Sequence, residues 1–264
     1  MRALDSLFAA TRDEGRAALV GYLPAGYPTV DQSVELLTAM IDSGADLVEV
    51  GVPYSDPVMD GPTIQAAAEA ALRGGFRLRD LFRVVEAVSS AGGRAVVMTY
   101  WNPVHRYGVD AFARDLAAAG GLGVITPDLV PDEAGDWLAA AERHGLDRIF
   151  LIAPSSSEER IVRTVEATTG FLYAAAVMGV TGARDAVGPA AAGLVARVRA
   201  HTSVPVGVGL GVRSGDQAAQ IAAFADAVIV GSALVSSATD GVDAVRALTA
   251  ELAAGVRRPV ATRI

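Results

Sequence analysis

The clearest indication of the fold comes from residues 47–65, which read Leu47-Val-Glu49-Val50-Gly-Val-Pro-Tyr-Ser-Asp-Pro-Val-Met-Asp60-Gly-Pro-Thr-Ile-Gln65. The apolar run 47–50 predicts a buried strand, and the Gly and Pro that follow it end that strand. A strand that ends in this way brings Glu49 to the rim of a sheet. Asp60 lies on the loop that follows, and we expect it to fold back toward Glu49.

Seven further apolar runs resemble this strand and alternate with segments of helical periodicity. The eight predicted strands are 18–23, 47–50, 95–99, 123–126, 149–152, 172–175, 206–208 and 227–230. The predicted helices between and after them are 31–42, 79–90, 110–119, 132–143, 156–168, 189–200, 215–223 and 242–254. Such alternation is typical of a parallel α/β sheet.

Eight strand-helix units in about 250 residues predict a (β/α)8 TIM barrel. We expect one barrel domain over residues 1–264, with an extra N-terminal helix at 3–12 that covers the bottom of the barrel. The helical period at 64–72 predicts an enlarged loop after the second strand. A dinucleotide-binding fold is disfavoured, because no Gly-x-Gly-x-x-Gly follows the first strand.

Composition limits the possible functions. The chain has 264 residues, of which 52% are hydrophobic, and a net charge of −8, which argues against binding to nucleic acid or an anionic membrane. No apolar stretch of roughly 18 residues predicts a membrane span, and the charged N-terminus is unlike a signal peptide, so we expect a cytoplasmic protein. The absence of cysteine excludes disulfides, thiolate nucleophiles and thiolate metal sites.

The inventory of catalytic side chains is narrow. All 22 basic residues are arginine, so a lysine Schiff base cannot form. The histidines His105, His144 and His201 lack metal-binding spacing, so we predict no metal site. Carboxylates are therefore the expected catalysts. Coding bias is the simpler explanation of the missing lysine, but the consequence for mechanism is the same.

Active sites of TIM barrels lie at the carboxyl ends of the strands, where we place Glu49, Tyr100, Asn102, Asp128 and Tyr173. With Asp60, Glu49 could form a general acid and general base pair, in which an apolar mouth raises the pKa of the more buried acid. The alternative is that Asp60-Gly61 is a simple turn and Glu49 a strand-end acid with structural hydrogen bonds. Spacing alone leaves both interpretations open.

Two glycine clusters in the last quarter predict a phosphate site. Gly207-Val-Gly209-Leu-Gly211 follows the seventh strand, and Gly231-Ser232-Ala233 follows the eighth and opens a short helix. Barrels commonly bind phosphate with backbone amides at these two loops, although such glycines often serve only tight turns.

Residues 178–184, Met-Gly-Val-Thr-Gly-Ala-Arg, follow the sixth strand and predict a lid. Gly179 and Gly182 could be its hinges, Thr181 could reach Asp60, and Gly182 could offer an amide to the phosphate. A surface loop without motion is the alternative.

Along nearly its whole length the chain resembles the α subunit of tryptophan synthase. The most specific match is residues 49–65, close to the family pattern E-(L/I/V)-G-(I/V)-P-(Y/F)-S-D-P-x-x-D-G-P-x-I-Q. The supporting matches, in family order, are Ser6-Leu-Phe8, Tyr22-Leu-Pro-Ala-Gly26, Met98-Thr-Tyr-Trp-Asn-Pro103, Pro127-Asp-Leu129, Gly179-Val-Thr-Gly182, Gly209-Leu-Gly211 and Gly231-Ser-Ala233.

This resemblance implies retro-aldol cleavage of indole-3-glycerol phosphate to indole and glyceraldehyde 3-phosphate, a lyase reaction in L-tryptophan biosynthesis. It implies that Glu49 transfers protons at indole C3 and the glycerol hydroxyl, and that Asp60 interacts with the indole nitrogen. The implied phosphate ligands are Gly182, Gly211, Gly231 and Ser232. The implied residues around the indole and glycerol are Tyr22, Met98, Tyr100, Ile125, Ile152, Tyr173, Thr181, Leu210 and Ile229.

The resemblance also implies a partner. The family's pyridoxal-phosphate β subunit would receive indole within an αββα assembly, and the loop 53–62 with residues 100–102 would contact it. No cofactor is expected in this chain, because pyridoxal phosphate cannot form an imine without a lysine.

Three positions depart from the commonest family pattern. Met59 stands in place of alanine, Ala176 in place of serine and Val177 in place of arginine. These departures bear on lid ordering and allosteric response rather than on the two acids.

Three alternative functions remain open from the sequence. The first is a free-standing indole-3-glycerol phosphate lyase that works without a β subunit. The others are a phosphate-binding barrel isomerase or epimerase, and a silent scaffold that only activates a partner.

Overall fold

Parallel β-strands form the centre of the molecule. The computed structural model describes residues 2–175, 189–209 and 211–258. The strands are β1 (Ala18–Pro24), β2 (Leu47–Gly51), β3 (Ala95–Met98), β4 (Gly123–Ile125), β5 (Asp147–Ile149), β6 (Leu151–Ile152), β7 (Leu172–Ala175), β8 (Val206–Gly209) and β9 (Ala227–Val230). Their order in the sheet is β5-β4-β3-β2-β1-β9-β8-β7-β6.

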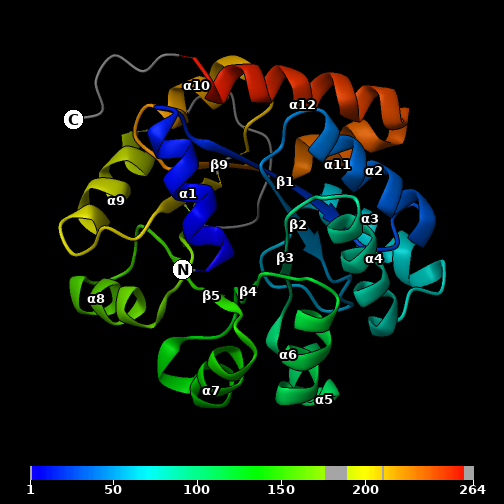
Figure 1. Ribbon diagram of the computed structural model, residues 1–264, viewed down its shortest axis with the longest axis horizontal. Coiled ribbons are helices and arrows are strands. Elements are labelled where there is room, and N and C mark those ends of the chain that lie inside the picture. The colour runs from blue at the N-terminus through cyan, green and yellow to red at the C-terminus, as the bar shows by residue number, and fades with distance from the viewer. Residues whose placement is uncertain (1, 176–188, 210, 259–264) are drawn as a thin grey trace.

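The sheet is a nearly closed barrel, and the predicted TIM barrel is confirmed (Figure 1). The predicted fifth strand, 149–152, is divided at Phe150 into β5 and β6. Its first part pairs with β4, whereas its second part pairs with β7. The carbonyl of Phe150 accepts a hydrogen bond from the amide of Tyr173 at 3.0 Å, so the chain turns from one neighbour to the other at this residue. The nine strands therefore occupy eight barrel positions.

Helices surround the strands, as the periodicity predicts (Figure 1). They are α2 (Val30–Asp42), α3 (Pro62–Arg73), α4 (Leu78–Ser90), α5 (Trp101–Tyr107), α6 (Val109–Ala118), α7 (Gly135–His144), α8 (Glu158–Ala167), α9 (Pro189–Arg199), α10 (Gly215–Ala222), α11 (Ser232–Ser237) and α12 (Val242–Val256). Short 3₁₀ turns occupy Pro131–Glu133 and Ala238–Asp240. The sequence did not predict α5, and α7 begins three residues later than predicted because the turn Pro131–Glu133 precedes it.

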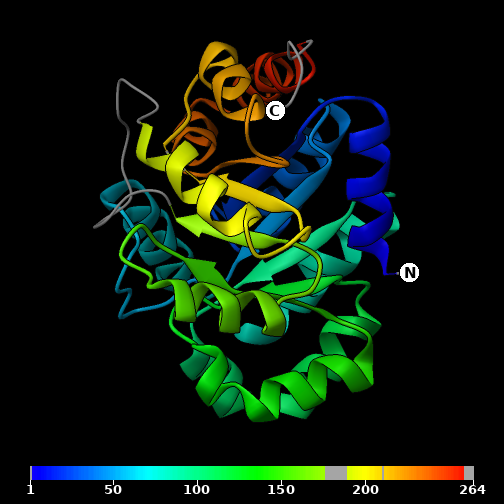
Figure 2. The same cartoon turned by 90° about the vertical axis from the view of Figure 1, so that its left-hand side faces the viewer.

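The extra N-terminal helix α1 (Ala3–Asp13) is present and lies at one end of the barrel (Figure 2). Its apolar side chains Leu4, Leu7 and Phe8 belong to the same buried cluster as Val20 and Leu47 from the strands. Burying apolar surface in this way is the main source of stability for such a contact. The amphipathic helix thus covers the bottom of the barrel and leaves the opposite end for the strand-end residues.

The enlarged loop after β2 holds α3, which begins at Pro62 directly after Gly61. Pro at the first helical position is favourable, since its missing N–H would have no partner there. This start fixes the end of the loop that carries Asp60. Within the described residues, no helix is both long and apolar enough to cross a membrane.

Candidate active site

The barrel interior brings Tyr22 and Glu49 together at its mouth. Side chains two residues apart on a strand face the same side of the sheet. Val20 and Leu47 lie in the interior cluster, so Tyr22 and Glu49 also face inward, and the two are direct neighbours in the register of β1 and β2. Among the other predicted indole contacts on the strands, Ile125 and Ile229 belong to this interior cluster and Met98 and Tyr173 pack against it, whereas Ile152 belongs to the larger buried cluster.

Glu49 is a buried acid, and no contact among the described residues offsets the cost of burying its charge. The side chain is 1% exposed, and its Oε1 atom has no hydrogen-bond partner among the described residues. Burial raises the pKa of Glu49 from 4.5 to about 8, because a carboxylate in apolar surroundings loses hydration. Glu49 is therefore largely protonated at neutral pH and can donate a proton.

Asp60 has a different environment. It is half-buried, and burial raises its pKa while a hydrogen bond with Tyr100 opposes that rise. The Tyr100 hydroxyl also accepts hydrogen bonds from the amides of Val58 and Met59, both at 3.2 Å. Tyr100 thus contacts both the backbone of the loop and the carboxyl group of Asp60. Burial is the main reason that the pKa of Tyr100 rises to about 12.

Further contacts order the loop that carries Asp60. Gln65 of α3 donates from Nε2 to the backbone carbonyl of Asp60 at 2.8 Å. The rings of Tyr54 and Tyr100 lie 5.2 Å apart between centroids, and Asn102 Nδ2 donates to the Tyr54 hydroxyl at 3.1 Å. The loop is therefore joined to residues 100–102 at the carboxyl ends of β2 and β3. This is the end of the barrel at which the sequence predicted Tyr100 and Asn102.

Asp128, another predicted strand-end acid, has a structural contact. Its two carboxylate oxygens accept from the amide of Trp101 at 2.9 and 3.1 Å, at the start of α5. It is an exposed side chain that caps a helix start, so it is not grouped with Glu49 and Asp60.

Two inward-facing glycines make room for tyrosine rings, a role that the sequence reasoning missed. A Cβ atom at Gly51 would collide with the ring and hydroxyl of Tyr22, and one at Gly209 would lie 2.5 Å from the Tyr173 hydroxyl. Gly51 stands two residues after Glu49 and therefore on the same face of the strand. This spacing is the sequence feature from which an inward-facing glycine could have been predicted. Gly209, read from the sequence as part of a phosphate loop, lies inside β8, whereas Gly211 lies beyond the strand with φ of 64°.

A cavity of about 450 Å³ adjoins the ends of β8 and β9. Gly211 and Ser232, two of the predicted phosphate ligands, line it together with Thr63 and Ala233. Gly231, the third, immediately precedes α11. The two predicted loops therefore meet at one cavity.

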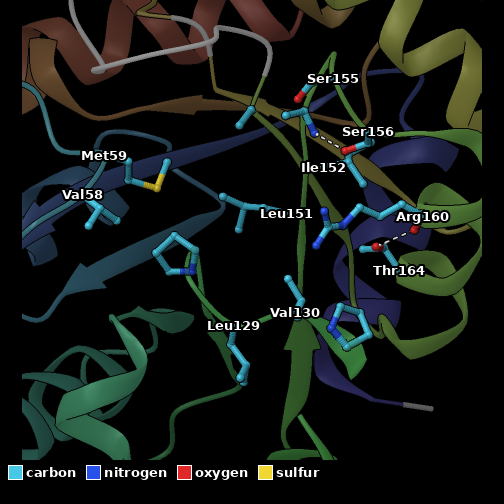
Figure 3. A pocket seen from close by; sticks show the side chains of 14 residues that line it. Val58, Met59, Leu129, Val130, Leu151, Ile152, Ser155, Ser156, Arg160 and Thr164 are labelled. Atoms are coloured by element: carbon cyan, nitrogen blue, oxygen red, sulfur yellow. Dashed lines mark hydrogen bonds between the residues drawn. The ribbon is translucent and has the colours of Figure 1, made fainter. Parts of the chain in front are cut away.

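A second cavity of about 430 Å³ is lined mainly by residues that follow β4 and β6 (Figure 3). Val58 and Met59 lie on one side of it, and Arg160 reaches toward it from α8 on the other. Ile152, predicted to contact indole, is among its lining residues. The loop that carries Asp60 thus borders this cavity.

Several predicted site residues lie outside the described residues. They are Thr181, Gly182 and Leu210, together with the predicted lid at 178–184 and the departures Ala176 and Val177. Among the described residues, no group of three His, Asp or Glu side chains could hold a metal ion. His144 and His201 instead contact Asp110 and Glu158 at 3.0 and 2.9 Å.

Comparisons with known proteins agree with this geometry. The family model "Tryptophan synthase alpha chain" matches residues 8–261. The tryptophan synthase alpha chain of Mycobacterium avium is 70% identical over 259 residues, 98% of this chain and 96% of that protein. The Nocardia farcinica alpha chain is 69% identical over 254 residues, 96% of each chain.

A solved structure of Mycobacterium tuberculosis tryptophan synthase has a TM-score of 0.94 and 68% identity, over 97% of this chain and 98% of that chain. The resemblance inferred from residues 49–65 is therefore confirmed. The chain belongs to the tryptophan synthase alpha chain family, and it is a subunit of an enzyme of tryptophan biosynthesis.

Proposed function

We propose that this chain cleaves indole-3-glycerol phosphate to indole and glyceraldehyde 3-phosphate by a retro-aldol reaction. The observation that carries this proposal is the environment of Glu49, a buried carboxyl with an unpaired oxygen and a pKa of about 8 at the mouth of the barrel. A general acid works best when its pKa lies near the working pH.

In the proposed mechanism, protonated Glu49 gives its proton to C3 of the indole ring. The ring nitrogen then carries positive charge, and the bond from C3 to the glycerol carbon breaks with its electrons returning to the ring. The hydroxyl on that carbon becomes the aldehyde and gives its proton to the Glu49 carboxylate. Glu49 ends the cycle protonated, so the reaction needs no other acid.

Asp60 has the complementary role of accepting a hydrogen bond from the indole N–H. That role requires an ionised carboxylate, and the hydrogen bond from Tyr100 opposes the effect of burial on its pKa. Paired acids whose environments differ in this way commonly divide acid and acceptor roles. The charge that develops on the ring nitrogen is stabilised where the carboxylate is already positioned.

The rest of the substrate is proposed to bind across the mouth. Backbone amides near Gly211, Gly231 and Ser232, together with Gly182, would hold the phosphate, in keeping with the cavity at the first two loops. The apolar residues on the interior face, with Tyr100, Thr181 and Leu210, would surround the indole. We expect no cofactor in this chain, since acid-base chemistry at C3 makes the ring its own electron acceptor.

We further propose that the chain works with a pyridoxal-phosphate β subunit in an αββα assembly. Val58, next to the tyrosine pair of Tyr54 and Tyr100, is 76% exposed and is an unusually exposed apolar side chain. Val58 lies on the loop 53–62, which the family resemblance assigns to the contact with the β subunit. A cytoplasmic location remains a prediction.

The test is an indole-release assay on the purified chain, alone and with a β subunit from a close relative. We expect weak cleavage by the chain alone and a clear increase when the β subunit is added. High turnover by the isolated chain would favour a free-standing lyase. Failure to consume indole-3-glycerol phosphate under both conditions would contradict the proposed reaction and leave the isomerase or scaffold alternatives.

A further inference from the structure

A side chain of helix α3 holds the backbone of Asp60. Gln65, the fourth residue of α3, is partly buried, and its Nε2 donates a hydrogen bond to the backbone carbonyl of Asp60 at 2.8 Å. The backbone amide of Gln65 donates to the carbonyl of Gly61 at 2.9 Å. One residue of the helix therefore binds two consecutive carbonyls at the end of the loop that carries the acid.

The contact with Asp60 is not part of the helix itself. Gly61 is the N-cap of α3 and has an extended backbone. The bond from the Gln65 amide to the Gly61 carbonyl belongs to the helical ladder, whereas the carbonyl of Asp60 lies one residue outside it. Pro62 at the first helical position favours the start of α3 whether or not the Gln65 side chain makes its bond. The side-chain bond therefore orders the loop rather than the helix.

Helix α3 is itself held in place by packing. Its buried side chains include Ile64, the residue before Gln65, which belongs to the main apolar core. The helix contacts β1 and also α11, which follows Gly231 of the proposed phosphate site. Because close packing fixes the backbone of α3, the side-chain amide of Gln65 extends from a fixed point toward Asp60.

Tyr100, at the carboxyl end of β3, holds the residues just before Asp60. Its hydroxyl accepts from the amides of Val58 and Met59, both at 3.2 Å, and it is hydrogen-bonded with the Asp60 carboxyl group. The amides that precede Asp60 are therefore bound to Tyr100, and the carbonyl of Asp60 itself is bound to α3. Contacts before and after one residue restrict its backbone, and they thereby limit the directions in which its carboxylate can point.

We propose that Gln65 is a positioning residue, whose side-chain amide fixes the backbone of Asp60 so that the carboxylate faces the indole nitrogen. The role rests on the proposed cleavage of indole-3-glycerol phosphate and adds one residue to the same site. A carboxylate that is placed in advance stabilises the charge on the ring nitrogen without reorganising during the reaction. Its contribution depends on geometry, so a small displacement of Asp60 is costly.

Gln65→Met tests the role, because it removes the donor and retains an unbranched side chain that favours a helix. With a β subunit present, we expect kcat/KM for indole release to fall by roughly fivefold, within the usual range for the loss of one hydrogen bond. Most of the loss should be in kcat, since the charge on the ring nitrogen develops only in the transition state. Thermal unfolding verifies the fold. Should Gln65→Met not fold, Gln65→Glu takes its place, since it keeps the shape of the side chain without the N–H donor.

A binding measurement separates positioning from a purely structural role. The probes are indole-3-propyl phosphate, which lacks the hydroxyl that would become the aldehyde, and its benzofuran counterpart, in which oxygen replaces the ring N–H. Because Asp60 accepts from that N–H in the proposed reaction, the unsubstituted chain should bind the indole analogue more tightly. We expect Gln65→Met to reduce this preference by about threefold.

Gln220→Met is the matched control. Gln220 is an exposed residue of α10, and the same substitution there should leave kcat/KM and the preference between the two analogues unchanged.

An unchanged kcat/KM in folded Gln65→Met would overturn the inference. A fall in kcat/KM with an unchanged preference between the analogues would also overturn it, since general loss of packing would explain that result. If neither variant of Gln65 folds, the contact serves the fold and the inference is likewise wrong. Absence of cleavage by the unsubstituted chain, or equal affinity of that chain for the two analogues, is a distinct result. It overturns the proposed reaction or the proposed role of Asp60, and this inference with it.

Discussion

Two carboxyl groups at opposite ends of the barrel are equally buried but have different neighbours. Glu49 at the mouth and Asp147 at the bottom are each 1% exposed, and each leaves one oxygen without a hydrogen bond among the described residues. Asp147 Oδ1, however, lies 3.6 Å from Arg2 Nη1, and the carboxyl group is hydrogen-bonded to Thr169. For Glu49, burial is the one cause of the raised pKa among the described residues.

The difference shows which buried acid is available for chemistry. Burial raises the pKa of Asp147, but Thr169 and Arg2 oppose the rise and hold its charged form. Among the residues that the structure describes, no such contact acts at Glu49, so its proton remains exchangeable near neutral pH. In TIM barrels the carboxyl end of the strands carries the active site and the opposite end serves stability, and the two acids follow that division.

The largest expected effect is on catalysis at the mouth. Glu49→Gln should reduce indole release by at least about 10²-fold, because an amide of the same shape cannot transfer the proton. The measurement is turnover with a β subunit present, alongside circular dichroism to verify folding. A folded variant with activity within a factor of a few of the unsubstituted chain would remove Glu49 from the mechanism.

The same substitution should increase stability at alkaline pH. The folded-state pKa of Glu49 lies above its unfolded value of 4.5, so its stabilising contribution is complete below pH 4.5 and is lost as the pH rises through about 8. Above that pH, Glu49→Gln avoids burying a charge, and we expect a gain of roughly 3–5 kcal/mol in the free energy of unfolding, at about 1.4 kcal/mol per pH unit.

Urea unfolding of both proteins across this pH range measures the gain. The gain should disappear toward pH 4.5, where the carboxyl is neutral in both states. A gain that is the same at all pH values would show that its origin is not the ionisation of Glu49.

At the bottom of the barrel the expected effect is on stability alone. Arg2→Gln removes the cation beside Asp147 and the hydrogen bond to the carbonyl of Leu146. We expect a loss of about 1–2 kcal/mol at neutral pH, moderate because Arg2 is 25% exposed, with unchanged turnover in the folded protein. Denaturant unfolding and the indole assay together test this. A fall in turnover without a loss of stability would show that the bottom of the barrel acts on catalysis and not on stability alone.

The smallest effect is expected at the outer partner of the same arginine. Glu142 is 67% exposed and bonds to Arg2 at 2.7 Å, so Glu142→Gln should change stability by less than about 0.5 kcal/mol. Thermal unfolding can compare it directly with Arg2→Gln. An equal loss in the two variants would mean that Asp147 is not the important partner of Arg2.

Much of the fold could be predicted from the sequence because it depends on local patterns. Continuous apolar runs located the strands, and the run 47–50 with the Gly and Pro after it placed Glu49 at the rim of the sheet. The short helix α5 was missed, since Trp101–Tyr107 is only seven residues long and contains Pro103. The division at Phe150 was also missed, because an apolar run does not reveal which neighbouring strand will accept its hydrogen bonds.

The site was predictable only in part for a similar reason. Glu49 and Asp60 lie in one continuous motif, but the contacts of Asp60 with Tyr100 and of Tyr22 with Gly51 join segments from different strands. Whether Gly209 serves a phosphate or a tyrosine ring depends on Tyr173 of the neighbouring strand β7. The pairing of Arg2 with Asp147 joins residues far apart in the chain, and no local signal marks it.

Glu49 holds a proton at neutral pH because no contact within the described part of the chain compensates its buried charge. The most direct measurement is a pH titration of the Glu49 side-chain carboxyl carbon by ¹³C NMR, assigned by its absence in Glu49→Gln. Burial without a compensating contact should give a titration midpoint near pH 8. A midpoint at or below the ordinary value of 4.5 would contradict it.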